Sequence, residues 1–121
     1  MAAIASFSHV CIVASTWAAE VSRWNPNVFF DLSGSTLVKM RGRLNQFQDI
    51  FWWTGAGQDT STPNNDPSAF IKVVFGSDTH SDRIETVVNM YRAFFDACDV
   101  PEVTRKMILG GTMSQLLGLP S

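Results

Sequence analysis

The sequence predicts an α/β protein in which parallel strands are covered by helices. Three short stretches are dense in Val, Ile and Phe, lack strict alternation of apolar and polar residues, and are bounded by turn residues: Ile4–Val13, Asn27–Ser33 and Phe70–Gly76. Such runs are typical of strands that are buried on both faces of a parallel sheet. Segments with helical spacing lie between and after them, and this alternation of strand and helix predicts the fold class.

Two helices are expected before the third strand. The first, Ala18–Trp24, ends at Asn25-Pro26 because a residue before proline is pushed out of the helical region. The second, Thr36–Trp53, carries apolar residues at spacings of three and four: Leu37, Met40, Leu44, Phe47 and Phe51. Residues 54–67 have no periodicity and are rich in Gly, Pro, Asn and Thr, which predicts a long polar loop, either a surface insertion or a functional segment.

The clearest helical pattern follows the third strand. One apolar stripe repeats at helical spacing through Ile84, Val87, Val88, Tyr91, Phe94, Phe95 and Cys98, and Asp82 with Glu85 suggests a capping box at its start. A further helix is expected to open at Val100–Glu102 and to end before Gly110-Gly111. A last short helix is expected to begin at a capping box in Thr112–Gln115.

Length and charge set limits on domain number and on partners. The chain of 121 residues is expected to form one domain, 1–121. Nine basic and eleven acidic residues give a net charge of −2, and 45% hydrophobic residues argue against a disordered chain or a dedicated nucleic-acid binder. Lys39, Arg41 and Arg43 form a small basic cluster without interleaved aromatic residues, so we interpret it as a solvated face and expect no nucleic-acid partner.

The N-terminal segment and the cysteines indicate the compartment. Met1–Ala19 contains no charged residue, but it lacks a basic start, and His9 with several hydroxyl residues interrupts its apolar run. It is therefore expected to be a buried strand leading into a helix rather than a signal peptide or a membrane span, and no membrane partner is expected. Cys11 and Cys98 lie in no CxxC motif, which favours reduced thiols and a cytoplasmic location.

The strongest candidate for chemistry is Asp78, which follows the apolar run Val73–Phe75. In parallel α/β folds, functional sites are built at the carboxyl ends of the strands. A carboxylate there can bind a metal ion or act as a general base on metal-bound water. The alternative is that Asp78 caps the next helix or binds loop amides, and the sequence does not decide between the two.

Five further residues carry weaker signals. His9 can bind a metal ion or exchange a proton, although a lone His in an apolar segment is more often a hydrogen-bonded core residue. His80 could reach the same cleft as Asp78, but an exposed loop position is favoured. For Asp31, hydrogen bonding to neighbouring backbone is favoured over a supporting role at a metal. Trp52-Trp53 is expected in the core or in a pocket wall.

Several phrases of the sequence resemble one enzyme family. The phrases are Trp24-Asn-Pro-Asn-Val-Phe-Phe-Asp-Leu-Ser-Gly34, Phe75-Gly-Ser-Asp78 and the ending Ile108-Leu-Gly-Gly-Thr-Met-Ser-Gln-Leu-Leu-Gly-Leu119. They are similar to the last two barrel strands and the C-terminus of the amidohydrolase-related, metal-dependent hydrolases. The resemblance implies a TIM-barrel fold, here a partial (β/α)8 barrel with about its last three βα units and C-terminal helices. The resemblance runs over nearly the whole chain and is poor in the 54–67 loop.

The resemblance also implies roles for two residues. Asp78 matches the last-strand aspartate, which in that family lies at the metal and helps to activate its water. His9 matches the sixth-strand histidine, which contacts metal or substrate and can transfer protons. The implied catalytic and metal-binding residues are therefore Asp78 and His9, with a divalent metal ion, zinc being expected. Cys11 stands where glycine is usual, and Thr112 replaces the usual asparagine.

A complete barrel takes about 250 residues, and the family's opening His-x-His motif is absent here. We therefore expect the C-terminal part of a hydrolase that acts on a C–N or ester-like bond of a small molecule, weakly active or inactive by itself. A metal-dependent decarboxylase of the same barrel family is an alternative. Another is a non-catalytic remnant or interaction module that forms a homo-oligomer or pairs with a missing N-terminal barrel portion.

Overall fold

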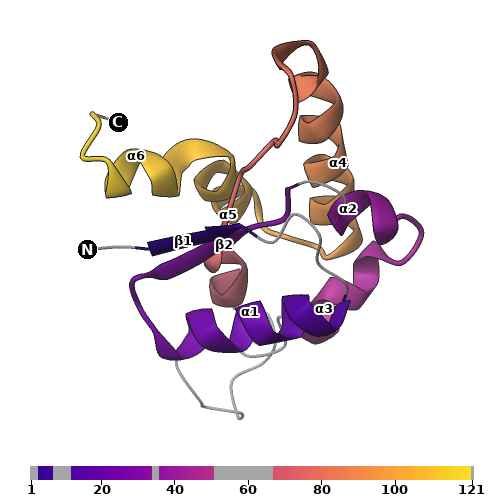
Figure 1. Cartoon of the computed structure of the whole chain (residues 1–121), viewed down its shortest axis with the longest axis horizontal. Helices are drawn as coiled ribbons and strands as arrows, with labels where there is room; N and C mark the ends of the chain where they lie inside the picture. Colours follow the sequence, from indigo (N-terminus) through magenta and orange to yellow (C-terminus); the bar gives the residue numbers. More distant parts are fainter. Residues whose placement is uncertain (1–2, 7–11, 34–35, 51–66, 121) are drawn as a thin grey trace.

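The computed structural model describes residues 3–6, 12–33, 36–50 and 67–120, which form a mixed α/β fold (Figure 1). Three parallel strands lie side by side in chain order: β1 (Ala3–Ser6), β2 (Val28–Asp31) and β3 (Val73–Val74). Ser6 pairs with Asp31, and Asp31 pairs with Val74, so the carboxyl ends of the three strands meet at one edge of the sheet. The predicted α/β class with parallel strands is confirmed.

Helices connect and follow the strands. Helix α1 (Ile12–Trp24) leads from β1 to β2 and runs below the strands in Figure 1. The connection from β2 to β3 contains α2 (Thr36–Lys39), the 3-10 turn η1 (Leu44–Gln46), α3 (Phe47–Ile50) and the 3-10 helix η2 (Pro67–Lys72). After β3 come η3 (Ser81–Arg83), α4 (Ile84–Ala97), α5 (Glu102–Lys106), the π-turn η4 (Met107–Gly111) and α6 (Thr112–Leu116). None of the helices in the described ranges is long and apolar enough to cross a bilayer.

All three predicted strands are shorter than expected. The predicted range Asn27–Ser33 is reduced to β2, and β3 ends before Phe75. Ile12 and Val13 belong to α1, and residues 70–72 belong to η2, so the predicted strand ranges were wrong at these residues. The residues directly before Val73 form η2 instead of a strand. Lys72 Nζ donates hydrogen bonds to the carbonyls of Asn25, at 3.2 Å, and Pro26, at 2.8 Å, in the turn before β2. These bonds connect the end of η2 to that turn.

The single helix predicted over Thr36–Trp53 was also wrong. Its start is α2, which ends at Lys39, and Gly42 in the turn that follows adopts a left-handed backbone with φ of 82°. The N–H of Arg43 donates to the carbonyl of Met40, at 2.8 Å, and closes the turn. The apolar spacing nevertheless identifies residues that face the core, because Leu37, Met40 and Phe47 are buried. Residues 51–66, including Trp52-Trp53 and most of the predicted polar loop, lie outside the described residues.

The helix predicted from the apolar stripe is confirmed as α4. Val87, Tyr91, Phe94 and Phe95 are buried on it, whereas Ile84 at its first residue is exposed. The two predicted capping boxes were wrong. Asp82 lies inside η3, and Thr112 continues directly from η4, so neither side chain caps a helix. Helix α5 begins after Pro101, as expected, and the chain bends at Gly110 before α6.

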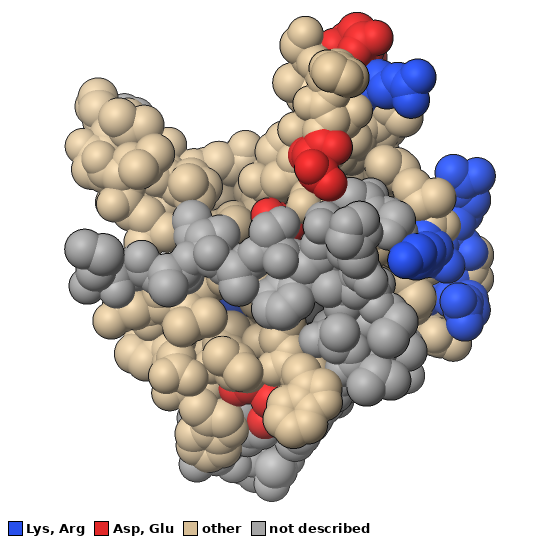
Figure 2. All heavy atoms as spheres, in the orientation of Figure 1, with Lys and Arg blue, Asp and Glu red and all other residues tan. Residues whose placement is uncertain are grey.

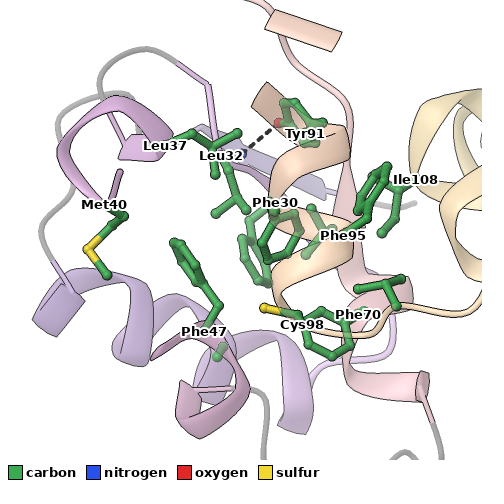
Figure 3. Close-up of a cluster of buried hydrophobic side chains, with 14 of the residues drawn as sticks. Phe30, Leu32, Leu37, Met40, Phe47, Phe70, Tyr91, Phe95, Cys98 and Ile108 are labelled. Atoms are coloured by element: carbon green, nitrogen blue, oxygen red, sulfur yellow. Dashed lines mark hydrogen bonds between the residues drawn. The ribbon is translucent and has the colours of Figure 1, made fainter. Parts of the chain in front are cut away.

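One face of the sheet packs on the hydrophobic core. Phe30 of β2 and Val73 of β3 are paired neighbours on this face and are fully buried. Figure 3 shows the side chains of α4 packing against Phe30, with Phe47 from α3 on one side and Ile108 from η4 on the other. The ring of Phe94 meets the edges of Phe47, at 5.2 Å between centroids, and Phe70, at 5.9 Å. Phe94 therefore joins three segments that are distant in the sequence.

We expect Phe94→Ala to lower the free energy of unfolding by about 3 to 5 kcal/mol, because it leaves a cavity between these segments. Equilibrium urea unfolding followed by circular dichroism measures the change. Val103→Ala is the control, since Val103 is 76% exposed and its truncation should cost less than about 0.5 kcal/mol. Similar decreases in the free energy of unfolding of the two variants would contradict the assignment of Phe94 to the core.

Candidate functional site

The hydroxyl group of Tyr91 ties the carboxyl ends of β2 and β3 together. Pairing between these strands ends at Asp31 and Val74. Beyond that point, Tyr91 Oη accepts hydrogen bonds from the N–H groups of Leu32, at 3.1 Å, and Gly76, at 3.3 Å, and donates to the carbonyl of Val74, at 3.5 Å. Figure 3 shows the bond to Leu32 reaching across from α4. One buried side chain thus extends the connection between the strands past the end of the sheet.

Burial raises the pKa of Tyr91 to about 12, and the nearby carboxylate of Asp31 adds to the increase. The hydrogen bonds from the Leu32 and Gly76 amides oppose this change, because they favour the phenolate. The hydroxyl therefore keeps its proton at neutral pH, and it acts as donor and acceptor at once.

Asp31, Ser33, Gly76 and Asp78 form what we call the carboxyl rim, at the ends of β2 and β3. Asp31 Oδ1 accepts hydrogen bonds from the backbone N–H of Ser33, at 3.1 Å, and from its hydroxyl group, at 2.7 Å. This confirms the local hydrogen bonding favoured for Asp31. A Cβ atom at Gly76 would lie 2.8 Å from Asp31 Oδ2, so only glycine lets the segment after β3 approach this carboxylate so closely.

Asp78 is exposed and has a left-handed backbone with φ of 45°. That conformation is uncommon for a residue with a side chain, and Asp is one of the few types that tolerate it. The N-cap positions of η3 and α4 are His80 and Arg83, so Asp78 caps neither helix. Its carboxylate makes no hydrogen bond or ion pair within the part of the chain that the structure describes. The capping alternative is therefore excluded, and an accessible carboxylate remains at the end of β3.

The structure describes some of the other candidate residues from the sequence and not others. His80 is an exposed loop residue two positions after Asp78, as favoured. His9, Cys11 and Trp52-Trp53 lie outside the described residues, so the pairing of Asp78 with His9 stays a prediction. Cys98 is a free, buried cysteine whose Sγ donates to the carbonyl of Leu44, at 3.2 Å. Burial raises the pKa of Cys98 to about 12, which makes this thiol a poor nucleophile.

The described residues alone do not fit a complete catalytic zinc site. Such a site normally uses three protein ligands. Among the described residues, no group of three or more His, Cys, Asp or Glu side chains is placed to hold a metal ion. Asp78 could supply one oxygen ligand, while Asp31 is engaged with Ser33. Any further ligands would have to come from beyond these residues.

Sequence reasoning missed two residues of this region. Tyr91 was expected only as part of an apolar stripe, and Gly76 only as a strand end. The signal for Tyr91 was its hydroxyl group, since a buried Tyr usually finds a polar partner. It is the one tyrosine in the chain, among nine phenylalanines. Nothing in the sequence signals the approach of Gly76 to Asp31, because that contact depends on the strand register.

We expect Tyr91→Phe to lower the free energy of unfolding by about 2 to 4 kcal/mol at pH 7, because the buried N–H of Leu32 and the partly buried N–H of Gly76 lose their acceptor. The difference in the free energy of unfolding between the wild type and Tyr91→Phe should become smaller at high pH. Tyr91 has a folded pKa of about 12, against 10.0 when unfolded, so its stabilising effect is complete below pH 10 and is lost as the pH rises toward 12.

Urea unfolding at pH 7, 9, 10 and 11 measures both effects, and the narrowing should be about 1.4 kcal/mol per pH unit above pH ~10. Phe95→Leu is the control, because it changes the neighbouring ring and removes no hydrogen bond. A difference between wild type and Tyr91→Phe that stays constant from pH 7 to 11 would contradict the assigned burial of the hydroxyl.

Comparison of the chain with protein-family models, with curated proteins and with solved structures gives no match. No family is therefore assigned. The geometry of the carboxyl rim and the resemblance of the quoted sequence phrases are the two indications of function.

Proposed function

We propose that the chain is the C-terminal part of a metal-dependent hydrolase of the amidohydrolase-related type, and that Asp78 and His9 are the residues it contributes to the metal site. The observation that carries the proposal is the Asp78 carboxylate itself. It is exposed at the carboxyl end of β3, held in a left-handed backbone conformation, and has no structural partner among the described residues. Uncommon backbone conformations of this kind cluster at functional sites.

The sheet supports the finer proposal of a partial (β/α)8 barrel. Consecutive parallel strands in the order β1-β2-β3, with helical segments between them, are what successive units of such a barrel would give. Phe30 is buried in the helical core, whereas Val28 at the start of β2 and Phe29 and Asp31 on the opposite face are half-buried. In a barrel, the face that carries Phe29 and Asp31 would be covered by strands other than the three that the described residues form.

The reaction class follows from the resemblance and not from the described residues. We propose hydrolysis of a C–N or ester-like bond in a small-molecule substrate, with His9 as the second functional residue. Because the described residues do not fit a complete zinc site, we derive no catalytic step for this chain and expect it to be weakly active or inactive alone. The proposed cytoplasmic location rests on the two cysteines outside any CxxC motif.

The proposal is tested by zinc binding to the full chain. We expect wild-type protein to bind zinc weakly, and Asp78→Asn to lower the affinity tenfold or more, since even residues that only support a metal ligand change affinity by about 10- to 100-fold. Competition with a chromophoric chelator measures both affinities.

Asp82→Asn is the matched control for this experiment. Asp82 is an exposed carboxylate four residues further along, inside η3, so the variant removes the same charge from the same region. We expect its zinc affinity to equal that of the wild type. Equal affinities of wild type and Asp78→Asn would overturn the proposed role of Asp78.

One observation favours the alternative of a non-catalytic module that pairs with a second copy. On α1, Trp17 is 71% exposed and Trp24 is 60% exposed, and with Val21 they line an open groove of about 540 Å³. The three residues recur at helical spacing, so they form one apolar face. Exposed apolar faces of this kind often mark interaction sites.

If this face pairs two copies, we expect a dimer whose dissociation constant rises at least tenfold in Trp17→Ser, because exposed Trp residues often dominate interface energy. Sedimentation velocity over a range of protein concentrations measures the dissociation constant of the dimer. Val103→Ser, which removes an exposed apolar residue from α5, is the control. A wild-type monomer at all concentrations would exclude self-pairing.

A further inference from the structure

A second groove, of about 320 Å³, lies between the α2–η1 segment and α4. We call it the α2–α4 groove. Leu37, Leu44 and Met90 give it an apolar lining, and Arg41, Thr86 and Asn89 add polar groups. Small-molecule sites have this composition, with mostly apolar walls and a few polar groups, and typically enclose about 300 to 1,000 Å³. None of these residues belongs to the carboxyl rim.

The charged side chains on the turn beside the α2–α4 groove are all positive. Lys39, Arg41 and Arg43 are exposed on the turn between α2 and η1. Figure 2 shows Lys and Arg side chains gathered at the right of the molecule, with no acidic side chain among them in this view. Within the described ranges, none of these three basic side chains forms an ion pair. Asp96, an acidic residue of α4, pairs instead with Arg105, at 2.6 Å. The basic cluster is therefore not neutralised by the described part of the chain.

The polar groups of the α2–α4 groove are mainly hydrogen-bond donors. Asn89 Oδ1 already accepts a hydrogen bond from Arg92 Nη1, at 3.2 Å, which leaves the Asn89 amide N–H groups to donate. The Thr86 hydroxyl can also donate, and the Arg41 guanidinium carries only donors. A ligand that satisfies these groups must present acceptors. A carboxylate fits best, because it accepts two hydrogen bonds from an arginine fork and complements the positive charge.

We propose that the α2–α4 groove binds a small carboxylate with an apolar body. At ~30 Å³ for each water-sized unit, the groove holds about ten non-hydrogen atoms, which is the size of a medium-chain fatty acid or an aromatic acid. The carboxylate lies at Arg41, and the apolar body lies along Leu37, Leu44 and Met90. The site is independent of the hydrolase proposal, because it uses different residues and a different chemistry.

Octanoate, with ten non-hydrogen atoms, is the probe. In two-dimensional amide NMR of the full chain, we expect saturable shifts in residues 37–44 and 86–93, with a dissociation constant on the order of a millimolar, as suits a ligand of this size. Octanol, which lacks the charge, and inorganic phosphate, which lacks the apolar body, should each bind at least threefold more weakly.

Arg41→Gln should weaken octanoate binding about three- to fivefold, the range expected for one exposed charge pair. Lys106→Gln removes an exposed positive charge from α5 and should leave the binding unchanged. Thermal unfolding of both variants checks that they fold. The proposal is overturned if wild-type shifts do not saturate, if they occur mainly around Trp17 and Trp24, or if octanol or Arg41→Gln matches the wild-type octanoate result.

Discussion

The buried hydroxyl of Tyr91 is the constraint on which the carboxyl side of the sheet depends. Strand β3 contains two residues and pairs with β2 at only two positions, which is too little to fix the segment that follows it. The hydroxyl binds the N–H groups of Leu32 and Gly76, and the N–H of Phe75 donates to the carbonyl of Ile108, at 2.9 Å. Helix α4 and the π-turn η4 thus replace the hydrogen bonds that a longer strand would provide. The packing of α4 and the position of the carboxyl rim are consequently coupled.

The carboxyl rim follows from this arrangement. Once Gly76 is held by Tyr91, its lack of a side chain lets the chain pass within van der Waals contact of Asp31. Asp31 turns toward Ser33, and the chain reaches Asp78 two residues later in a left-handed conformation. The two carboxylates therefore have different environments, because Asp31 is bound by a neighbouring serine and Asp78 is exposed. That difference is why the proposed function assigns the ligand role to Asp78.

Much of the fold could be predicted from the sequence where burial alone decides the structure. The apolar stripe of α4 identified Tyr91, Phe94 and Phe95 as core residues, and the apolar spacing of Leu37, Met40 and Phe47 also marks residues that are buried. The element boundaries were less predictable. Apolar spacing does not reveal the left-handed turn at Gly42 after α2, or that residues 70–72 form a 3-10 helix in which Lys72 binds carbonyls more than 40 residues away. The contact between Gly76 and Asp31 depends on strand register, which no local pattern encodes. The sequence singled out Asp78 as a candidate because it follows an apolar run, and its role at a metal ion stays a prediction.

The proposed metal site is tested most directly by locating where a divalent cation binds on the wild-type chain. Mn²⁺ favours oxygen ligands and broadens the NMR signals of nearby amides. In a titration with substoichiometric Mn²⁺, we expect the amides of residues 76–79 and 31–33 to broaden first, because these segments contain the carboxyl rim. Earlier broadening around another carboxylate, such as Asp96 or Glu102, with the carboxyl rim unaffected, would contradict the proposed role of Asp78.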